Sequence, residues 1–497
     1  MLKIIFSHEV RQLLKSPATL FMLGLLAAAM VFGIYNGTRA VERQNKSAVV
    51  AVADEAAAKK RVLDQLIAYE RFTAERGIPR VFAPVNHAPP RPGQSPQGTN
   101  AGAVGGELVK EVAILPPTGL AAFAVGQMDL QRNYTLVDMK NKFNMSDNFE
   151  IENPLNLMTG TFDISFVVIF LLPVFIIALT YDMLSGEKES GTLALAMTQP
   201  VSLRTFMAGK LLSRIALLML VIVIIGLYAM LFSGSALGVL DDPDAWVRFG
   251  LFLLATFIYS LFWFGLGVFV NSLNKSSETN VTILSGAWLL IVVVLPALIS
   301  LTATTVYPAP SRMELKVAMR DASIAAEKAE DDTTKAYYTD HVEMLPDKET
   351  ETYLTVFLAR QDALEKAVEP VFAQFRGQLE RQEAIVDWFQ LLSPAVAMQN
   401  ALNEISGNST DRYNAYMDKV FAFQKEWKQF FTPRYLQREI MDSSMYDDFP
   451  KFEYGKEAPY VVLGRILLSA FAVLLISIGM NAYAFLHLRR FGVRENS

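Results

Sequence analysis

One polar hairpin, residues 184–214, contains the charged residues whose types and spacing predict a specific role. The residues singled out there are Glu187, Glu189, Gly191, Thr192, Leu193, Pro200 and Arg204. Carboxylates stabilise the positive N-terminus of a helix, so the two acids predict a short helix from Thr192 to Thr198. Pro200 ends this helix, because a proline disfavours helical backbone in the residue before it. A short helix fixed between two membrane spans is a lever for a partner protein; the alternative is an ordinary solvated loop.

A second helix is predicted to begin after Ser202. Its hydroxyl is placed to cap the helix, and Val201 is placed to pack against Phe206 as a hydrophobic staple. This helix carries Lys210 and Arg214 into the following span. The hairpin is therefore expected to be joined rigidly to the spans on both sides.

Motifs for catalysis are absent from the sequence. A Gly-x-x-x-x-Gly-Lys-Ser/Thr phosphate loop does not occur, since Gly209-Lys210 lacks the leading glycine and precedes a leucine. The four histidines are scattered, and the chain has no cysteine, which excludes disulfides and thiolate metal sites. We therefore expect a protein that is not itself an enzyme and that binds no cofactor or metal.

Composition indicates a membrane protein. Hydrophobic residues make up 52% of the 497-residue chain and charged residues 19%, against about 25% charged residues in soluble domains. Six apolar runs reach the roughly 20 residues that a helix needs to cross the hydrocarbon core of a bilayer. Pro173 and Pro296 fall inside spans, where neighbours must satisfy the carbonyls that they free.

The predicted fold class is a mainly α membrane protein with six transmembrane helices and an extracytoplasmic helical domain built from two insertions. The predicted organisation is an interfacial amphipathic helix at 1–16, a first span at 17–37, a first extracytoplasmic insertion at 38–163, spans two to five at 164–304, a second helical insertion at 305–460, a sixth span at 461–488 and a tail at 489–497.

The N-terminal 16 residues place their apolar side chains near one helical face, which predicts a helix lying in the membrane interface. The alternative is that they form only the first turns of the first span, but Ser16-Pro17 favours a break. The first span is expected to be a retained anchor rather than a signal peptide, because its apolar run is long and no convincing cleavage site follows.

The two insertions differ in composition. Residues 83–106 are rich in Pro, Gly, Asn and Gln, which predicts a flexible loop. Residues 306–459 carry about nine more acidic than basic side chains, with helices expected at 312–332, 348–388 and 412–431. The aromatic side chains of this insertion are expected to pack its core or to contact a partner, with the core favoured for most of them; the ones considered are Trp388, Phe389, Trp427, Phe430 and Phe431.

Lysine and arginine near the span ends predict the orientation. They occur in the N-terminal segment, the hairpin, the turn at Lys275 and the C-terminal tail, which share one face if the chain has six spans. That face is then cytoplasmic, and the two insertions lie on the other. The predicted location is the bacterial cytoplasmic membrane, with a multi-pass chain and both termini in the cytoplasm.

The spans are nearly free of ionisable residues; Asp163 and Asp182 lie near the two ends of the second span. Asp182 either tethers the hairpin or is a plain surface charge. Ion-coupled transporters usually need buried carboxylates or histidines at membrane depth. The sequence therefore favours energy delivered by a partner protein over ion-coupled transport.

The segment GEKESGTLALAMTQPVSLRTFMAGK, residues 186–210, resembles the coupling-helix segment of type-2 ABC transporter permeases. The segment shows the elements of that family in the same order: an acidic pair, Gly-Thr-Leu, Pro-Val-Ser, an arginine and Gly-Lys. Residues 152–182 and 391–413 are similar to a permease subfamily with large extracytoplasmic inserts. The resemblance extends from the N-terminal helix to the last span.

The resemblance implies the permease subunit of an ATP-driven exporter, with ATPase coupling assigned to the hairpin residues named above. It implies an identical or paralogous second permease and separate nucleotide-binding ATPase subunits, which hold ATP and Mg²⁺. Membrane lipid and a periplasmic protein are further candidate partners, nucleic acid is not expected, and the substrate-binding residues are unknown. Two alternatives stay open: a mechanotransmission subunit that drives an extracytoplasmic partner without moving cargo, and a membrane receptor without an ATPase.

Overall fold

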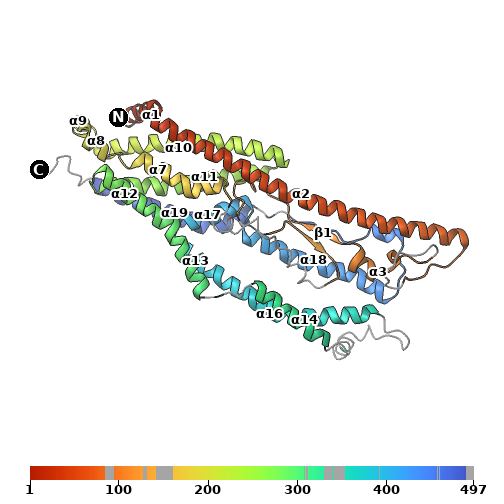
Figure 1. Ribbon diagram of the computed structural model, residues 1–497. Helices are drawn as coiled ribbons and strands as arrows, with labels where there is room; N and C mark the ends of the chain where they lie inside the picture. The colour runs from red at the N-terminus through yellow and green to blue at the C-terminus, as the bar shows by residue number, and fades with distance from the viewer. Residues whose placement is uncertain are drawn as a thin grey trace.

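The computed structural model describes residues 1–83, 94–126, 131–140, 161–306, 312–328, 353–390, 392–455 and 459–488, together with 308, 339 and 457. The molecule is elongated, with apolar spans at one end and a polar domain at the other (Figure 1). Helix α2, Pro17–Arg76, runs along both parts. It has 60 residues, so at 1.5 Å per residue it is about 90 Å long, roughly three times the thickness of the hydrocarbon core.

Among the described residues, six helical segments are long and apolar enough to cross a membrane, which confirms the prediction of a mainly α membrane protein with six spans. Besides α2, they comprise α6 (Ile164–Phe166), η4 (Val167–Leu171) and α7 (Leu172–Thr180); α10 (Leu203–Leu237); α11 (Pro243–Ser272); α12 (Ser277–Trp288), η5 (Leu289–Val294) and α13 (Leu295–Val306); and α19 (Pro459–His487). Their inner faces form one apolar core that includes the buried rings of Tyr259 and Trp263. Large apolar side chains remain exposed on α10, α13 and α19, as contact with lipid requires.

Helix α1, Leu2–Lys15, precedes the first span and packs against α10. Ser16 has extended backbone, where the sequence predicts a break, and its hydroxyl accepts a hydrogen bond of 3.4 Å from Thr19 N. The two helices approach closely, because a Cβ placed on Gly209 would lie 2.6 Å from Cγ2 of Ile5. α1 is therefore a separate helix seated on the third span.

Both spans that contain an internal proline widen into a π-helical turn just before it: η4 precedes Pro173, and η5 precedes Pro296. A proline ring clashes with the carbonyl four residues earlier, and a wider turn relieves this crowding. The carbonyl of Ile169, four residues before Pro173, accepts a hydrogen bond of 3.1 Å from the Tyr259 hydroxyl. The expectation that a neighbour satisfies the freed carbonyl is confirmed there.

The polar domain packs α18, Thr410–Leu436, with a two-stranded antiparallel sheet, β1 (Glu111–Ile114) and β2 (Tyr134–Val137), and with the outer part of α2. Its core is aromatic and includes the fully buried side chains of Trp427 and Tyr416. The domain is mainly helical, as predicted, and the sheet is an addition. Strands of four residues are too short to stand out in the sequence.

Residues 94–106 are folded, so the prediction of a flexible loop over 83–106 is wrong for this part. They form η1 (Gln97–Thr99), α3 (Ala101–Ala103) and the start of η2 (Val104–Leu108). Asn100 caps α3, and Gly105 O accepts a hydrogen bond of 3.0 Å from the Trp427 indole. Contacts with distant residues order a segment whose own composition predicts disorder. Residues 84–93 lie outside the described part of the chain.

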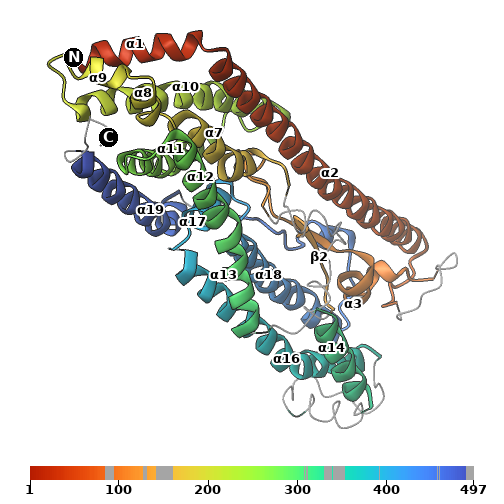
Figure 2. The ribbon, with the colours of Figure 1, turned by 60° about the vertical axis from the view of Figure 1, so that its left-hand side comes forward.

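The second insertion contains α14 (Arg312–Lys328) and α16 (Tyr353–Gln390), close to their predicted positions, followed by α17 (Pro394–Ser406), which the sequence did not predict as a helix. α17 packs against α11 and α19 (Figure 2). Just before it, the Ser393 hydroxyl donates a hydrogen bond of 3.4 Å to Ile291 O, the carbonyl of an η5 residue inside the fifth span. The insertion therefore reaches back into the bundle of spans.

The aromatic residues of this insertion do not all lie in a core. Trp427 is 1% exposed and Phe431 is fully buried, as expected. Trp388 is 78% exposed and Phe389 is 40% exposed near the end of α16. These two residues therefore lie outside the core of the single chain, which leaves partner contact as the alternative that applies to them.

Candidate functional site

The hairpin consists of two short helices, α8 (Ser185–Glu189) and α9 (Thr192–Ala196). Gly191 joins them with a φ of +75°, a left-handed conformation that favours glycine. Glu187 and Glu189 therefore lie within α8. The sequence predicts both at the N-terminus of the second helix, and Glu187 contacts it through the Thr192 hydroxyl, whereas Glu189 binds Ser277. The turn at Gly191 separates both acids from α9, so they lie on the short helix that follows the second span. Helix α9 ends at Ala196, two residues before the predicted end at Thr198.

The chain returns to the membrane through a capped turn. Pro200 is exposed in this turn. The Ser202 hydroxyl then accepts a hydrogen bond of 3.2 Å from Thr205 N and begins α10, as predicted. Arg204 is half-buried in the first turn of that helix. The cap fixes the direction in which α10 leaves the hairpin.

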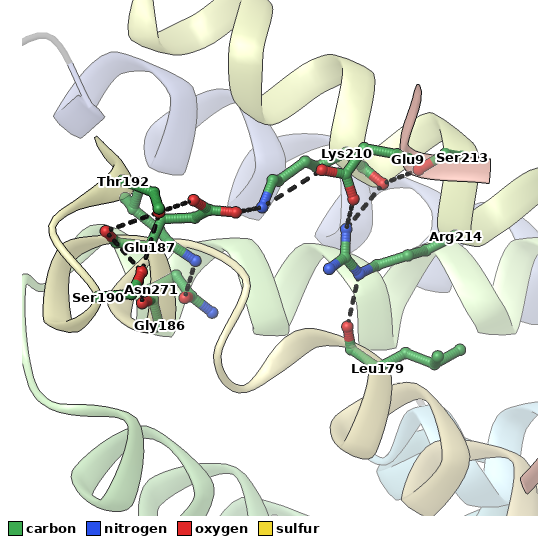
Figure 3. A network of polar contacts seen from close by, with 11 residues as sticks. Glu9, Leu179, Gly186, Glu187, Ser190, Thr192, Lys210, Ser213, Arg214 and Asn271 are labelled. Atoms are coloured by element: carbon green, nitrogen blue, oxygen red, sulfur yellow. Dashed lines mark hydrogen bonds and ion pairs between the residues drawn. The ribbon is translucent and has the colours of Figure 1, made fainter. Parts of the chain in front are cut away.

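A buried charge network lies where α1 meets α10 (Figure 3). Glu9 of α1 is 6% exposed, and its carboxylate lies 3.4 Å from Nζ of Lys210 and 3.3 Å from Nη1 of Arg214. Arg214 Nε also donates a hydrogen bond of 2.7 Å to Leu179 O on α7. Removing one partner from such a buried group leaves an unpaired charge, at a cost of about 3–5 kcal/mol. The network therefore binds α1, α7 and α10 to one another.

Glu187 extends this network into the hairpin. Its carboxylate pairs with Lys210 and accepts a hydrogen bond from the Thr192 hydroxyl (Figure 3). Because Thr192 is the first residue of α9, one side chain joins α8, α9 and α10. Glu9 and Glu187 contact the two cations directly, and Asp182 adds a further negative charge near Lys210 and Arg214.

Glu189 fixes the hairpin to the fifth span. Its carboxylate accepts hydrogen bonds of 2.7 Å from Ser277 N and 2.8 Å from the Ser277 hydroxyl. Ser277 is the first residue of α12, where a negative charge is favourable because of the helix dipole. The Ser185 and Ser277 hydroxyls add a contact of 2.8 Å.

Two buried amides connect the α7–α8 junction to the fourth and fifth spans. Asn271 accepts a hydrogen bond of 3.0 Å from Leu184 N and donates one of 2.7 Å to Thr180 O. Asn280 donates a hydrogen bond of 3.1 Å to Tyr181 O. They satisfy backbone groups where α7 gives way to α8. A displacement of the hairpin would therefore be felt by α11 and α12 as well as by α7 and α10.

The outward side of the hairpin is uncharged around α9. Leu193 points inward and is 1% exposed, whereas Leu195 points outward and is 72% exposed. We call the exposed residues of this segment the α9 surface: Gly191, Thr192, Ala194, Leu195, Thr198, Gln199 and Pro200. A partner that touched this surface would meet small, polar and aliphatic side chains, while the carboxylates of Glu187 and Glu189 are engaged behind it.

A family model described as ABC-2 family transporter protein matches residues 3–488. The chain belongs to this family. The match includes α1, the hairpin, the six candidate spans and the polar domain, and it confirms the resemblance to type-2 ABC permeases. This ABC-2 family transporter is therefore a multi-pass membrane protein. No curated protein matches the chain.

Within this ABC-2 family transporter, the predicted residues divide by position. Glu187, Glu189 and Leu193 face the rest of the chain, while Gly191, Thr192 and Pro200 belong to the α9 surface. Their role in ATPase coupling stays a prediction. Among the described residues, no group of three or more His, Asp or Glu side chains could hold a metal ion.

Glu9 was missed by the sequence reasoning. It lies 205 positions from Arg214, and spacing within a segment reveals nothing about such a distant partner. One signal was available: an acid within an otherwise basic and apolar N-terminal helix, which has Lys3, Arg11 and Lys15 as its other charged residues besides His8. A carboxylate in this setting is expected to form an ion pair with a lysine or arginine.

Proposed function

We propose that the chain is the transmembrane permease subunit of an ATP-driven ABC exporter, which couples ATP hydrolysis on separate nucleotide-binding subunits to export of a substrate across the bacterial inner membrane. ATP and Mg²⁺ bind to those subunits, and a second permease, identical or paralogous, completes the complex. The observation that carries the proposal is the hairpin: an uncharged α9 surface faces outward, and its back is tied to α7, α10 and α12.

The mechanism follows from these contacts. Force applied to α9 passes through Glu187 and Lys210 into α10, and through Arg214 into α7. Glu189 passes the same displacement to α12. The contacts of Arg214 are buried and those of Glu189 are exposed, but each joins the hairpin or α10 to a further span, so the cytoplasmic ends of three spans tilt together. Closure of the ATPase pair would supply the force.

The orientation is part of the proposal. The beginning of α1, the hairpin and the end of α19 at His487 lie at one end of the molecule (Figure 2). The segments at this end of the molecule are the ones that carry lysine and arginine next to the spans, which favours a cytoplasmic location for this end. The polar domain then extends outside the cytoplasm, where a periplasmic partner could reach it.

The test is retention of the ATPase by a variant of the α9 surface. Leu195→Asp places a charge where the partner is expected to bury Leu195. We expect the amount of ATPase that co-purifies with the full chain in lipid to fall at least tenfold, because this corresponds to only about 1.4 kcal/mol of binding free energy.

The matched control is Val81→Asp, at a valine that is 58% exposed on the polar domain. This variant should retain the ATPase as the wild type does. Equal retention by both variants would contradict docking at α9, and absence of any ATPase from the wild-type complex would contradict the exporter itself.

A mechanotransmission subunit is the second candidate, and the continuous helix α2 favours it. A single helix of 60 residues joins the membrane to the core of the polar domain, so tilting of the spans would move that domain directly. Leu290, 55% exposed on η5, discriminates between the two functions. A cysteine there should react with a water-soluble reagent during ATP turnover if cargo crosses between the permeases, and stay protected if force alone is transmitted.

A further inference from the structure

A cavity of about 500 Å³ opens among α13, α16, α17 and α19, far from the hairpin. Its volume lies within the range of roughly 300–1,000 Å³ that ligand pockets occupy. One part of its wall is apolar and includes Ile299, Ala303 and Ile466. Another part is charged and includes Arg465 and Glu404. The cavity therefore suits a molecule with one apolar and one polar end.

The cavity lies at the boundary between hydrocarbon and water. On α19, Arg465 precedes the helix end at His487 by 22 residues, which is about 33 Å along the axis. The hydrocarbon core is about 30 Å thick, so Arg465 falls at headgroup level when the other end of the helix lies at the opposite interface. On the fifth span, Ile299 is the same number of residues from Ser277. Both helices thus contribute to the cavity at the depth of the lipid headgroups.

The charged wall presents both signs side by side. Arg465 Nη1 lies 3.3 Å from Glu404, and its Nη2 lies 3.4 Å from Glu457. The Arg465 side chain is 28% exposed, so part of the guanidinium group stays accessible. Asp411, in the first turn of α18, adds an exposed carboxylate to the cavity rim. A cation between carboxylates complements a ligand that carries a phosphate next to an ammonium group.

We propose that this cavity binds a zwitterionic phospholipid with an ammonium headgroup, from the leaflet next to the polar domain. The phosphate contacts Arg465, the ammonium group contacts Glu404 and Asp411, and the upper part of an acyl chain packs on Ile299 and Ile466. Bound there, the lipid joins α17 to the fifth and sixth spans. The proposal depends on membrane insertion of the chain and not on ATPase docking at the hairpin.

The test is native mass spectrometry of the purified full chain, stripped of lipid and then titrated with phosphatidylethanolamine or phosphatidylglycerol. The wild type should bind one phosphatidylethanolamine at least tenfold more tightly than the anionic lipid. The Glu404→Gln, Asp411→Asn double variant should lose this preference, because it keeps the partner of the phosphate and removes those of the ammonium group.

A steric variant provides an independent test. Ser300→Trp fills part of the cavity from an exposed position on α13, whereas Leu298→Trp changes a neighbouring residue that is 51% exposed and does not line the cavity. Only the first should abolish the tight site. Equal binding of both lipids, or the same loss with Leu298→Trp, would overturn the proposal. Equal competition by glycerophosphoethanolamine, which lacks acyl chains, would show that the ligand is a soluble zwitterion and not a lipid.

Discussion

Glu9 and Glu189 hold the hairpin from two directions: the Glu9 carboxylate is buried, whereas the Glu189 carboxylate binds Ser277 at an exposed position. Glu9 lies among buried cations, and Glu189 caps the first residue of α12. The sequence identified Glu187 and Glu189 from a local acidic motif but assigned them to the start of α9. Their actual partners, Lys210 and Ser277, depend on how the spans pack, which local spacing does not reveal.

The first prediction concerns Glu9. Glu9→Gln keeps the shape of the side chain and removes the charge that faces Lys210 and Arg214. We expect the free energy of unfolding of the full chain to fall by about 3 kcal/mol, because two buried cations lose their shared counter-charge. Chemical denaturation in detergent measures this change. The control is Glu42→Gln, at an exposed position on α2. An equal loss of stability from both substitutions would show that the ion pairs of Glu9 do not stabilise the fold.

The second prediction concerns Glu189. Glu189→Gln weakens two hydrogen bonds to Ser277 and removes a negative charge from a helix N-terminus. A loss of about 1 kcal/mol in stability is expected. More ATP should also be hydrolysed per transported or transmitted event, because the hairpin is joined less firmly to the fifth span. Glu278→Gln, one residue beyond Ser277 on α12, should leave turnover unchanged. If the neighbouring substitution uncouples the complex to the same degree, general charge at this end of α12 is responsible.

At the scale of elements, the spans could be predicted because each is a long apolar run, and Ser202 could be predicted as a cap because capping is local. α17 could not, since its 13 residues mix Asn and Gln with short apolar side chains and it is stabilised by packing against α11 and α19. The prediction of a flexible loop was wrong for residues 94–106 for a related reason. Gly105 lies against the ring of Phe431, a contact that composition does not anticipate.

The third prediction concerns the joint between α2 and the loop around Ala122, which packs in the apolar core of the spans. A Cβ on Gly37 would lie 2.0 Å from Ala122 O. The loop around Ala122 has little freedom to move, because Asn408 donates hydrogen bonds of 2.8 Å to Ala121 O and 2.6 Å to Ala124 O. Gly37→Ala should therefore lower the free energy of unfolding by about 2 kcal/mol.

Gly24→Ala provides the control for this joint on the same helix. A Cβ on Gly24 would meet nothing within 4 Å, so the substitution should be neutral or slightly stabilising, since alanine favours helix. Denaturation of both variants under one condition compares them. A similar loss from both would contradict the explanation by crowding, because helix propensity alone favours alanine at both positions.

At the scale of the whole molecule, we expect the hairpin and the polar domain to lie on opposite sides of the membrane. The chain has no cysteine, so single introduced cysteines report on one position each. Val81→Cys should react with a membrane-impermeant maleimide once the outer membrane is opened. Leu195→Cys should react only after the inner membrane is permeabilised. The reverse pattern would invert the topology and remove the hairpin from the reach of ATP.

Contact between α9 and an ATPase can be measured by site-specific photocrosslinking from Leu195→Cys in native membranes. A benzophenone maleimide attached there should crosslink the full chain to a nucleotide-binding ATPase subunit, and the same reagent at Val81→Cys should not. A crosslink from Leu195→Cys to lipid alone, or an equal ATPase crosslink from both positions, would contradict this contact.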